Sequence, residues 1–109
     1  MKGIGIDIES ISNFSQKKFE NNISFYKKIF TNAEIEYCLN RSDPYQHFTA
    51  HFCAKEAAIK ALVREKIKLT EIEVKIDKKR SSLIIPNEKN VLVSMSYTKK
   101  YATAIVMIE

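Results

Sequence analysis

Apolar and polar positions along the chain alternate with two periods, and the clearer of the two predicts one long helix. In residues 48–66, a helical rotation places two apolar stripes on opposite sides. One stripe has large side chains (Phe48, Phe52, Ile59, Leu62 and Val63) and the other has small ones (Ala50, Ala54, Ala57 and Ala61). Ser42-Asp43-Pro44 marks the start, since proline is common in a first turn. A helix that is apolar on two sides is expected to be a core helix.

A period of two predicts a strand at residues 2–8. Its side chains alternate between an isoleucine face and a thin face: Ile4, Ile6 and Ile8 on the first, Gly3, Gly5 and Asp7 on the second. The glycines would let a neighbouring backbone or helix come close to the thin face. Asp7 stands at the end of that face, where it either caps the following helix or takes part in a functional site.

Capping signals predict two shorter helices before the long one. Ser10 or Ser12 opens a helix that ends near Asn21, and a short apolar and basic segment follows it. The sequence Thr31-Asn32-Ala33-Glu34 is a capping box, which predicts a helix over residues 32–40.

Beyond residue 66 the period changes to that of strands. Four are predicted, at residues 72–76, 83–85, 91–96 and 101–108, with polar turns at 78–82 and 97–100. The last strand is apolar on both faces, so it is expected at the centre of its sheet. Together the two periods predict an α+β fold in which an antiparallel sheet packs against the long central helix and the shorter helices.

The composition fits one folded domain that covers residues 1–109. Hydrophobic residues make up 45% of the chain, and two glycines and two prolines leave little room for linkers. The net charge of +5 indicates an acidic partner, which could be nucleic acid, a phosphate-bearing ligand or an acidic protein.

The cysteines and the first residues bear on the compartment. Cys38 and Cys53 lack the spacing of a metal site, so we expect reduced, buried thiols in a cytoplasmic protein. Asp7 interrupts the first apolar run, which argues against a signal peptide, and no apolar segment approaches the length that spans a membrane.

Polar residues on the long helix are the candidates for chemistry. Glu56 lies beside the large apolar residues, where a carboxylate needs a partner, and Lys60 follows one turn later. His51 and Lys55 form another spaced pair. Asp7 and Glu56 could together hold magnesium, with Lys60 on a phosphate, although ordinary surface pairs would give the same spacing.

Three segments resemble the holo-acyl-carrier-protein synthase family, the small 4'-phosphopantetheinyl transferases. They are GIGIDIE at residues 3–9, HFCAKEAAIKAL at 51–62 and VSMSYTKKYATAIVMIE at 93–109. The family patterns are a G-I-D opening, a helix with (R)F-x-x-K-E-A-x-x-K-A and an ending with S-x-S-H-T-x-x-Y-A. The segment FTNAEIEYC also resembles the family's L-T-x-x-E-L. Order and spacing agree across nearly the whole chain.

The resemblance implies a reaction and roles for particular residues. Asp7 and Glu56 match the magnesium-binding acids, and Lys60 matches a lysine on the coenzyme A pyrophosphate. These three are the predicted catalytic residues. The reaction would carry 4'-phosphopantetheine from coenzyme A to a serine of apo acyl carrier protein and release adenosine 3',5'-bisphosphate. Either Glu56 or a metal-bound water would take the serine proton.

Further residues match the coenzyme A site of the family. Lys55 is a second lysine of the helix motif, and Ser96 and Thr98 fall in the ending that lines the site. Two predicted contacts depart from the family: Tyr97 replaces a histidine, and His51 replaces a common arginine. From the sequence, His51 is equally a hydrogen-bonded core histidine and Tyr97 a turn aromatic.

The resemblance also implies partners. An acidic carrier protein would dock on basic residues of the first helix and the segment after it, with Lys17, Lys18, Lys27 and Lys28 available. The family forms trimers with active sites between subunits, so a homotrimer is expected. Two alternatives remain: a weakened family member that binds coenzyme A or carrier protein without turnover, and a small basic nucleic-acid-binding domain. The phenylalanines argue against the second, because they sit at core periodicity.

Overall fold

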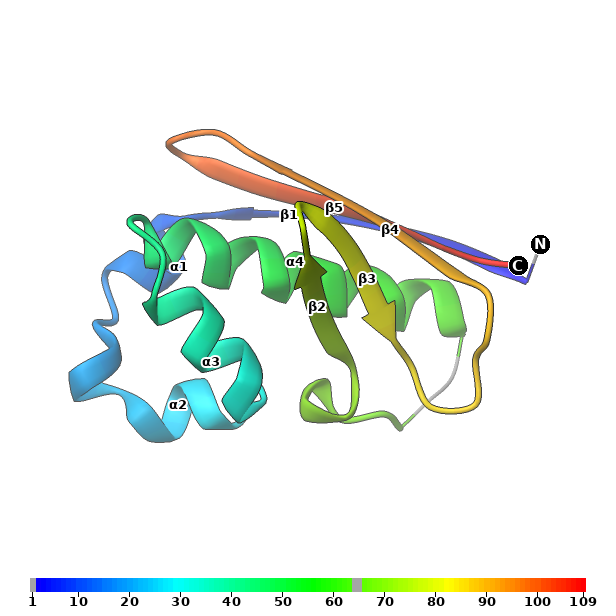
Figure 1. Ribbon diagram of the computed structural model, residues 1–109, viewed down its shortest axis with the longest axis horizontal. Helices are drawn as coiled ribbons and strands as arrows, with labels where there is room; N and C mark the ends of the chain where they lie inside the picture. The colour runs from blue at the N-terminus through cyan, green and yellow to red at the C-terminus, as the bar shows by residue number, and fades with distance from the viewer. Residues whose placement is uncertain (1, 64–65) are drawn as a thin grey trace.

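Helix α4 (Pro44–Leu62) is the longest element and lies at the centre of the fold (Figure 1). The computed structural model describes residues 2–63 and 66–109. The helix begins where predicted, with Asp43 as N-cap and Pro44 in the first turn. Val63 leaves the helix in a left-handed conformation and is 87% exposed, so its predicted place on the large apolar stripe is wrong. Part of the predicted continuation, at residues 64 and 65, lies outside the described residues.

Two antiparallel sheets accompany this helix, which confirms the predicted α+β fold class. Strands β1 (Gly3–Ser10), β5 (Tyr101–Ile108) and β4 (Val91–Tyr97) form the larger sheet in the order β1-β5-β4. The last strand is therefore central, as its two apolar faces predicted. Strands β2 (Glu73–Asp77) and β3 (Arg80–Ile84) form a separate pair rather than part of one sheet.

The β2–β3 connection is tighter than the predicted turn over residues 78–82. Lys78 and Lys79 both have positive φ angles, of 47° and 67°. Positive φ at both central residues gives a two-residue hairpin loop whose twist matches that of its strands. Strand β3 therefore starts at Arg80, and only Lys78 and Lys79 form the turn.

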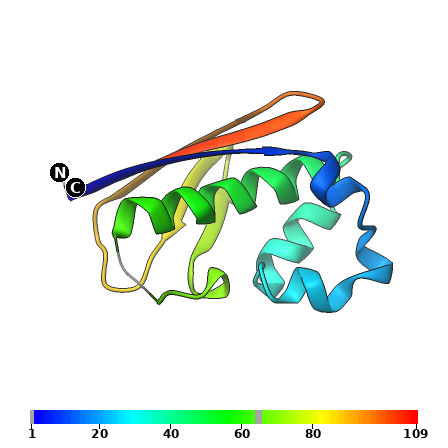
Figure 2. The same ribbon diagram turned by 180° about the vertical axis from the view of Figure 1, so that it is seen from behind.

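The thin face of β1 packs directly on α4, as the glycines predicted. A Cβ atom at Gly3 would collide with the carbonyl oxygen of Ala61, and one at Gly5 with that of Ala57. Figures 1 and 2 show β1 running along the length of α4. Because side chains alternate in a strand, Asp7 is the next residue to face the helix. The isoleucines Ile4, Ile6 and Ile8 lie on the outer face and are 56%, 62% and 65% exposed.

Short helical segments lie near the N-terminal end of α4 (Figure 1) and enclose a cluster of buried aromatic side chains that includes Phe14, Tyr26 and Phe48. They are α1 (Ser12–Ser15), the 3-10 turn η1 (Phe19–Asn21), α2 (Ile23–Lys27) and α3 (Asn32–Leu39). The predicted single helix to Asn21 is therefore broken. Tyr26 explains the break, because its hydroxyl shares its one proton between the carbonyl oxygens of Lys17, at 2.7 Å, and Phe14, at 3.1 Å. The capping box at Thr31 and Glu34 is present as predicted.

Candidate active site

Asp7, Lys60 and Glu56 meet where β1 crosses α4. The Lys60 ammonium donates to Oδ1 of Asp7 at 3.2 Å and to the carbonyl oxygen of Ile6 at 2.9 Å. Glu56 lies one helical turn before Lys60, so both project toward the same strand. The hydroxyl of Thr103, on the neighbouring strand β5, donates to the Asp7 carbonyl oxygen at 2.8 Å and fixes this part of β1.

The Asp7 side chain is only 10% exposed, and its two oxygens differ in their partners. Oδ1 accepts from Lys60, whereas Oδ2 is buried without a hydrogen-bond partner among the described residues. Burial first, and then the charge of Asp7, raises the pKa of Glu56, although Lys60 opposes the shift. Two neighbouring carboxyl groups with a buried free oxygen fit a divalent cation, because carboxylate oxygens are preferred ligands of magnesium.

Glu9 is a third acid in this cluster that the sequence reasoning missed. Burial raises its pKa to about 7, helped by the neighbouring carboxyl group of Asp7 and by the charge of Glu56. The period of two could have found it, because Glu9 is two residues beyond Asp7 and shares its face of β1. The described part of the chain nevertheless contains no ready group of three or more His, Cys, Asp or Glu placed to hold a metal.

Lys55 lies away from this cluster, and its surroundings argue against the predicted contact with coenzyme A. Its side chain is fully buried, with the ammonium 2.6 Å from Oε1 of Glu34. It also donates to the carbonyl oxygens of Leu69 and Ile72, at 2.9 and 2.6 Å. Burial lowers the pKa of Lys55, and Glu34 opposes that shift. Three partners use all three protons of the ammonium, so Lys55 ties α4 to α3 and to the segment before β2.

His51 lines a cavity of about 260 Å³ together with three other rings, those of Tyr37, His47 and Tyr97. The rings of Tyr37 and His51 are stacked with centroids 5.7 Å apart, and those of His47 and Tyr97 meet edge to face at 5.4 Å. We call this space the ring pocket. The structure thus brings together the two residues at which the chain departs from the family pattern.

The imidazole of His51 is 1% exposed, and neither ring nitrogen has a hydrogen-bond partner among the described residues. Burial lowers its pKa to about 4, and His47 and Lys55 contribute to the shift. The expected core histidine is therefore buried, yet it lacks the expected hydrogen bonds. At neutral pH His51 carries no charge, so it cannot serve as the cationic partner of a phosphate.

Ser96 and Thr98, the remaining predicted contacts, lie apart from the three acids. Ser96 is exposed on the outer face of the large sheet, in register with Thr103. The hydroxyl of Thr98 accepts from the backbone N–H groups of Lys100 and Tyr101 at 3.2 and 3.1 Å and closes the β4–β5 turn. Within one chain, neither side chain joins the Asp7 cluster.

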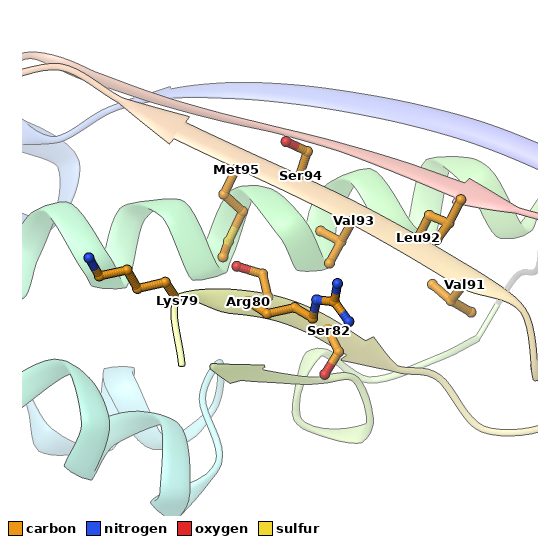
Figure 3. Close-up of a pocket in the computed structure, with 9 residues that line it drawn as sticks. Lys79, Arg80, Ser82, Val91, Leu92, Val93, Ser94 and Met95 are labelled. Atoms are coloured by element: carbon orange, nitrogen blue, oxygen red, sulfur yellow. The ribbon is translucent and has the colours of Figure 1, made fainter. Parts of the chain in front are cut away.

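A larger cavity, of about 660 Å³, lies between β3 and β4. Figure 3 shows Val93 and Met95 pointing from β4 toward β3, with Lys79 in the β2–β3 turn and Arg80 at the start of β3. Met95 and Lys79 also line the ring pocket, so the two cavities adjoin. The larger cavity holds none of the three acids.

Comparison with protein families gives a match over nearly the whole chain. The model of the 4'-phosphopantetheinyl transferase superfamily matches residues 3–106. A holo-[acyl-carrier-protein] synthase of Chlamydia trachomatis serovar L2 is 37% identical over 119 aligned positions, which cover all of both chains. The enzyme of the same name from Thermodesulfovibrio yellowstonii is 35% identical and covers 99% of this chain and 98% of its own.

Solved structures agree with this match. A holo-(acyl-carrier-protein) synthase from Bacillus anthracis, in complex with CoA (3',5'-ADP), superposes with a TM-score of 0.85 at 27% identity. The alignment covers 98% of this chain and 95% of that one. A holo-[acyl-carrier-protein] synthase from Neisseria meningitidis has the same TM-score at 23% identity, over 100% and 98% of the chains, and so shares the fold. None of the helices in the described ranges is long and apolar enough to cross a membrane.

Proposed function

Since the chain belongs to the 4'-phosphopantetheinyl transferase superfamily and is a phosphopantetheinyl transferase, we propose that it modifies an acyl carrier protein with magnesium held by Asp7 and Glu56. Coenzyme A is the donor, as the complexes of related structures with coenzyme A support. The observation that carries the proposal is the meeting of Asp7, Glu56 and Lys60 at one point, where Oδ2 of Asp7 is buried and has no hydrogen-bond partner in the described part of the chain.

The chemistry is a displacement at phosphorus. The serine oxygen of the carrier forms a bond to the phosphorus that bears pantetheine, and the bond between that phosphorus and the bridging pyrophosphate oxygen breaks. Adenosine 3',5'-bisphosphate leaves with the electron pair, and the serine proton passes to Glu56 or to a water at the same site. A bound magnesium ion supplies charge stabilisation to the pyrophosphate. Lys60, whose side chain is 55% exposed, can turn from Asp7 to the same anion.

The ring pocket suits the uncharged adenine base of coenzyme A. A neutral imidazole offers one donor and one acceptor, and His51 has both nitrogens free among the described residues. An adenine base presents a matching donor and acceptor and stacks on aromatic rings. His51 and Tyr97 therefore contact the base in this proposal, whereas Lys79, at the rim, is the cation available to a phosphate.

A homotrimer would cover the apolar outer face of the large sheet. Register places large apolar side chains there in adjacent rows: Ile4, Ile6, Ile8, Leu92, Ile105 and Met107. Three isoleucines that are more than half exposed on one strand indicate an interface, because a solvated face would carry polar residues. A second copy would also explain the position of Ser96 on this face, away from the acids of its own chain. In this arrangement the active sites lie between subunits, with Ser96 of one copy near the acids of another.

The carrier protein docks, in this proposal, on the cationic end of the molecule near α1 and α2. The ammonium of Lys17 lies 4.4 Å from the ring centre of Phe25, and that of Lys18 lies 4.8 Å from that of Tyr45. Lys27 and Lys28 are exposed nearby. Cations held in place over aromatic rings suit an acidic surface.

The cysteines bear on the compartment in which the protein works. Cys38 and Cys53 are buried free thiols, which is consistent with the reducing cytoplasm.

Mass spectrometry of an apo carrier protein tests the proposal. Incubation with enzyme, coenzyme A and magnesium should add one phosphopantetheine to the carrier, and Asp7→Ala or Glu56→Ala should abolish the gain. If the protein binds coenzyme A but adds no phosphopantetheine to any of several carriers, the result would favour a weakened family member that binds without turnover. The uncharged His51 and Tyr97 are the reason for this alternative. The nucleic-acid alternative has little support, because Phe14, Phe30 and Phe48 are buried in the core.

A further inference from the structure

The described residues on the inner wall of the ring pocket are uncharged at neutral pH. Four rings form much of this wall, those of Tyr37, His47, His51 and Tyr97. The imidazole of His51 is 1% exposed, and neither of its nitrogens has a hydrogen-bond partner among the described residues. Burial lowers the pKa of both histidines below the ordinary value. Such a wall fits a planar, uncharged group that forms hydrogen bonds, whereas burying an anion against it would be costly.

Two cations, Lys79 and Arg41, lie near the rim of the ring pocket, and both are exposed to water. Lys79 belongs to the two-residue turn between β2 and β3, and Figure 3 shows its side chain extending away from Arg80. Arg41, in the segment between α3 and α4, has its guanidinium 5.4 Å from the ring centre of Tyr37. Water and salt screen the attraction between exposed cations and a phosphate, so each such contact adds little affinity.

Coenzyme A carries one group that the ring pocket does not bury, the 3'-phosphate. In the proposed function the adenine base occupies the ring pocket, and the pyrophosphate lies at Asp7, Glu56 and Lys60. The 3'-phosphate is bonded to the ribose between these two groups, so a base inside the pocket leaves it at the rim, beside Lys79. 3'-Dephospho-coenzyme A has the same base, pyrophosphate and pantetheine and lacks this phosphate alone. Both compounds can therefore make every buried contact of the proposed function.

We propose that the protein does not select coenzyme A by its 3'-phosphate, so that 3'-dephospho-coenzyme A is a donor of nearly equal efficiency. This inference rests on the proposed function, because it takes the adenine base to lie in the ring pocket. The step has the same balance as before: the serine oxygen bonds to the phosphorus that bears pantetheine, and the bond to the bridging oxygen breaks. Adenosine 5'-monophosphate leaves with the electron pair, and the serine proton passes to Glu56 or to a water.

The rates of carrier modification with each donor test this inference. Full-length protein, magnesium and an apo carrier are incubated with either compound, and the same phosphopantetheine mass gain is followed in time. We expect the two values of kcat/KM to differ by less than about tenfold, as weak contacts with exposed cations allow. Lys79→Met should slow the reaction with coenzyme A toward the rate with 3'-dephospho-coenzyme A. Lys78→Met, the exposed neighbour in the same turn, is the matched control and should leave the ratio unchanged.

The outcomes separate this inference from the function on which it rests. If coenzyme A modifies the carrier and 3'-dephospho-coenzyme A falls below that limit, the inference is overturned and the proposed function stands. If neither compound modifies any of several carriers, the proposed transfer is overturned. Titration calorimetry of each compound into the protein with magnesium then decides whether the 3'-phosphate is selected, by the same limit applied to the two dissociation constants. Absence of binding by both compounds would overturn the inference as well.

Discussion

The ammonium of Lys60 lies 3.2 Å from Oδ1 of Asp7, across a separation of 53 positions in the chain. This contact joins the first strand to the central helix at the place where Glu56 also projects. It depends on Gly3 and Gly5, because any larger residue would hold β1 away from α4. The glycines of the opening motif therefore set the distance between the acids that the chemistry needs.

Gly5→Ala should destabilise the fold. Its Cβ would meet the carbonyl oxygen of Ala57, which belongs to the helix backbone and cannot turn away. We expect a loss of about 1–3 kcal/mol or more in the free energy of unfolding, measured by urea denaturation. Ser24→Ala, at an exposed position of α2, is the control and should change it little. Equal stability of Gly5→Ala and the wild type would refute the close packing of β1 on α4.

Lys60→Met should slow transfer without unfolding the protein. The substitution removes the ammonium next to Asp7 and Glu56, and with it one stabilising partner of the transferred phosphate. We expect a fall in kcat/KM for coenzyme A of about a hundredfold, measured by the rate of carrier modification. Lys75→Met, at an exposed position of β2, controls for the loss of a positive charge. A rate equal to that of this control would show that Lys60 has no part in the reaction.

Lys55→Met should damage stability. It leaves the Glu34 carboxylate buried without its ion-pair partner, and breaking such a pair typically costs about 3–5 kcal/mol. Denaturation at neutral pH measures the loss, and the double variant with Glu34→Gln should recover part of it. If the folded double variant binds coenzyme A as tightly as the wild type, Lys55 is structural. A large loss of affinity in that variant would instead restore the predicted coenzyme A contact.

Acid should destabilise the protein through His51. Its pKa falls from about 6.5 to about 4 on folding, so the unfolded chain binds a proton more readily than the native one. The stability is fully present above pH 6.5 and is lost as the pH falls toward 4, by roughly 3 kcal/mol. Unfolding of the wild type and of His51→Phe across this range checks the prediction. The variant should show a flatter pH dependence, and parallel curves would contradict the assignment to His51.

Ile6→Lys should dissociate the proposed trimer. Ile6 is 62% exposed on the outer face of the single chain, so the substitution leaves the core untouched and places a charge in the interface. Sedimentation equilibrium should show a trimer for the wild type and a smaller species for the variant. Ile84→Lys, at an exposed position of the separate β2–β3 pair, is the control and should remain trimeric. A monomeric wild type would contradict the proposed assembly.

Local pattern was enough to predict the elements that place the site. The two stripes of α4, the glycine face of β1 and the capping box at Thr31 are all encoded within a few residues. The broken helix before Asn21 was not predictable in this way. Its break depends on the hydroxyl of Tyr26, which reaches back to carbonyl groups of an earlier segment.

Pairing between distant segments is what the sequence could not show. Glu34 reads as a capping residue, and it is one, since its Oε1 accepts from the Thr31 N–H at 2.8 Å. The same side chain also binds Lys55 and accepts from the backbone N–H of Val74 at 2.7 Å, which requires the packing of α3, α4 and β2. Lys55 therefore looked like a free cation. The complete burial of Lys55 decides its role, and the spacing of residues along the helix does not predict that burial.

The rates of Asp7→Asn, Glu56→Gln and the double variant, measured as magnesium-dependent modification of an apo carrier, test the central proposal most directly. If both acids hold one ion, each single variant should lose nearly all activity, and the double variant should be little worse than either single one. Losses that multiply in the double variant would contradict a shared ion. Wild-type modification that persists at full rate after magnesium is chelated would contradict the cation itself.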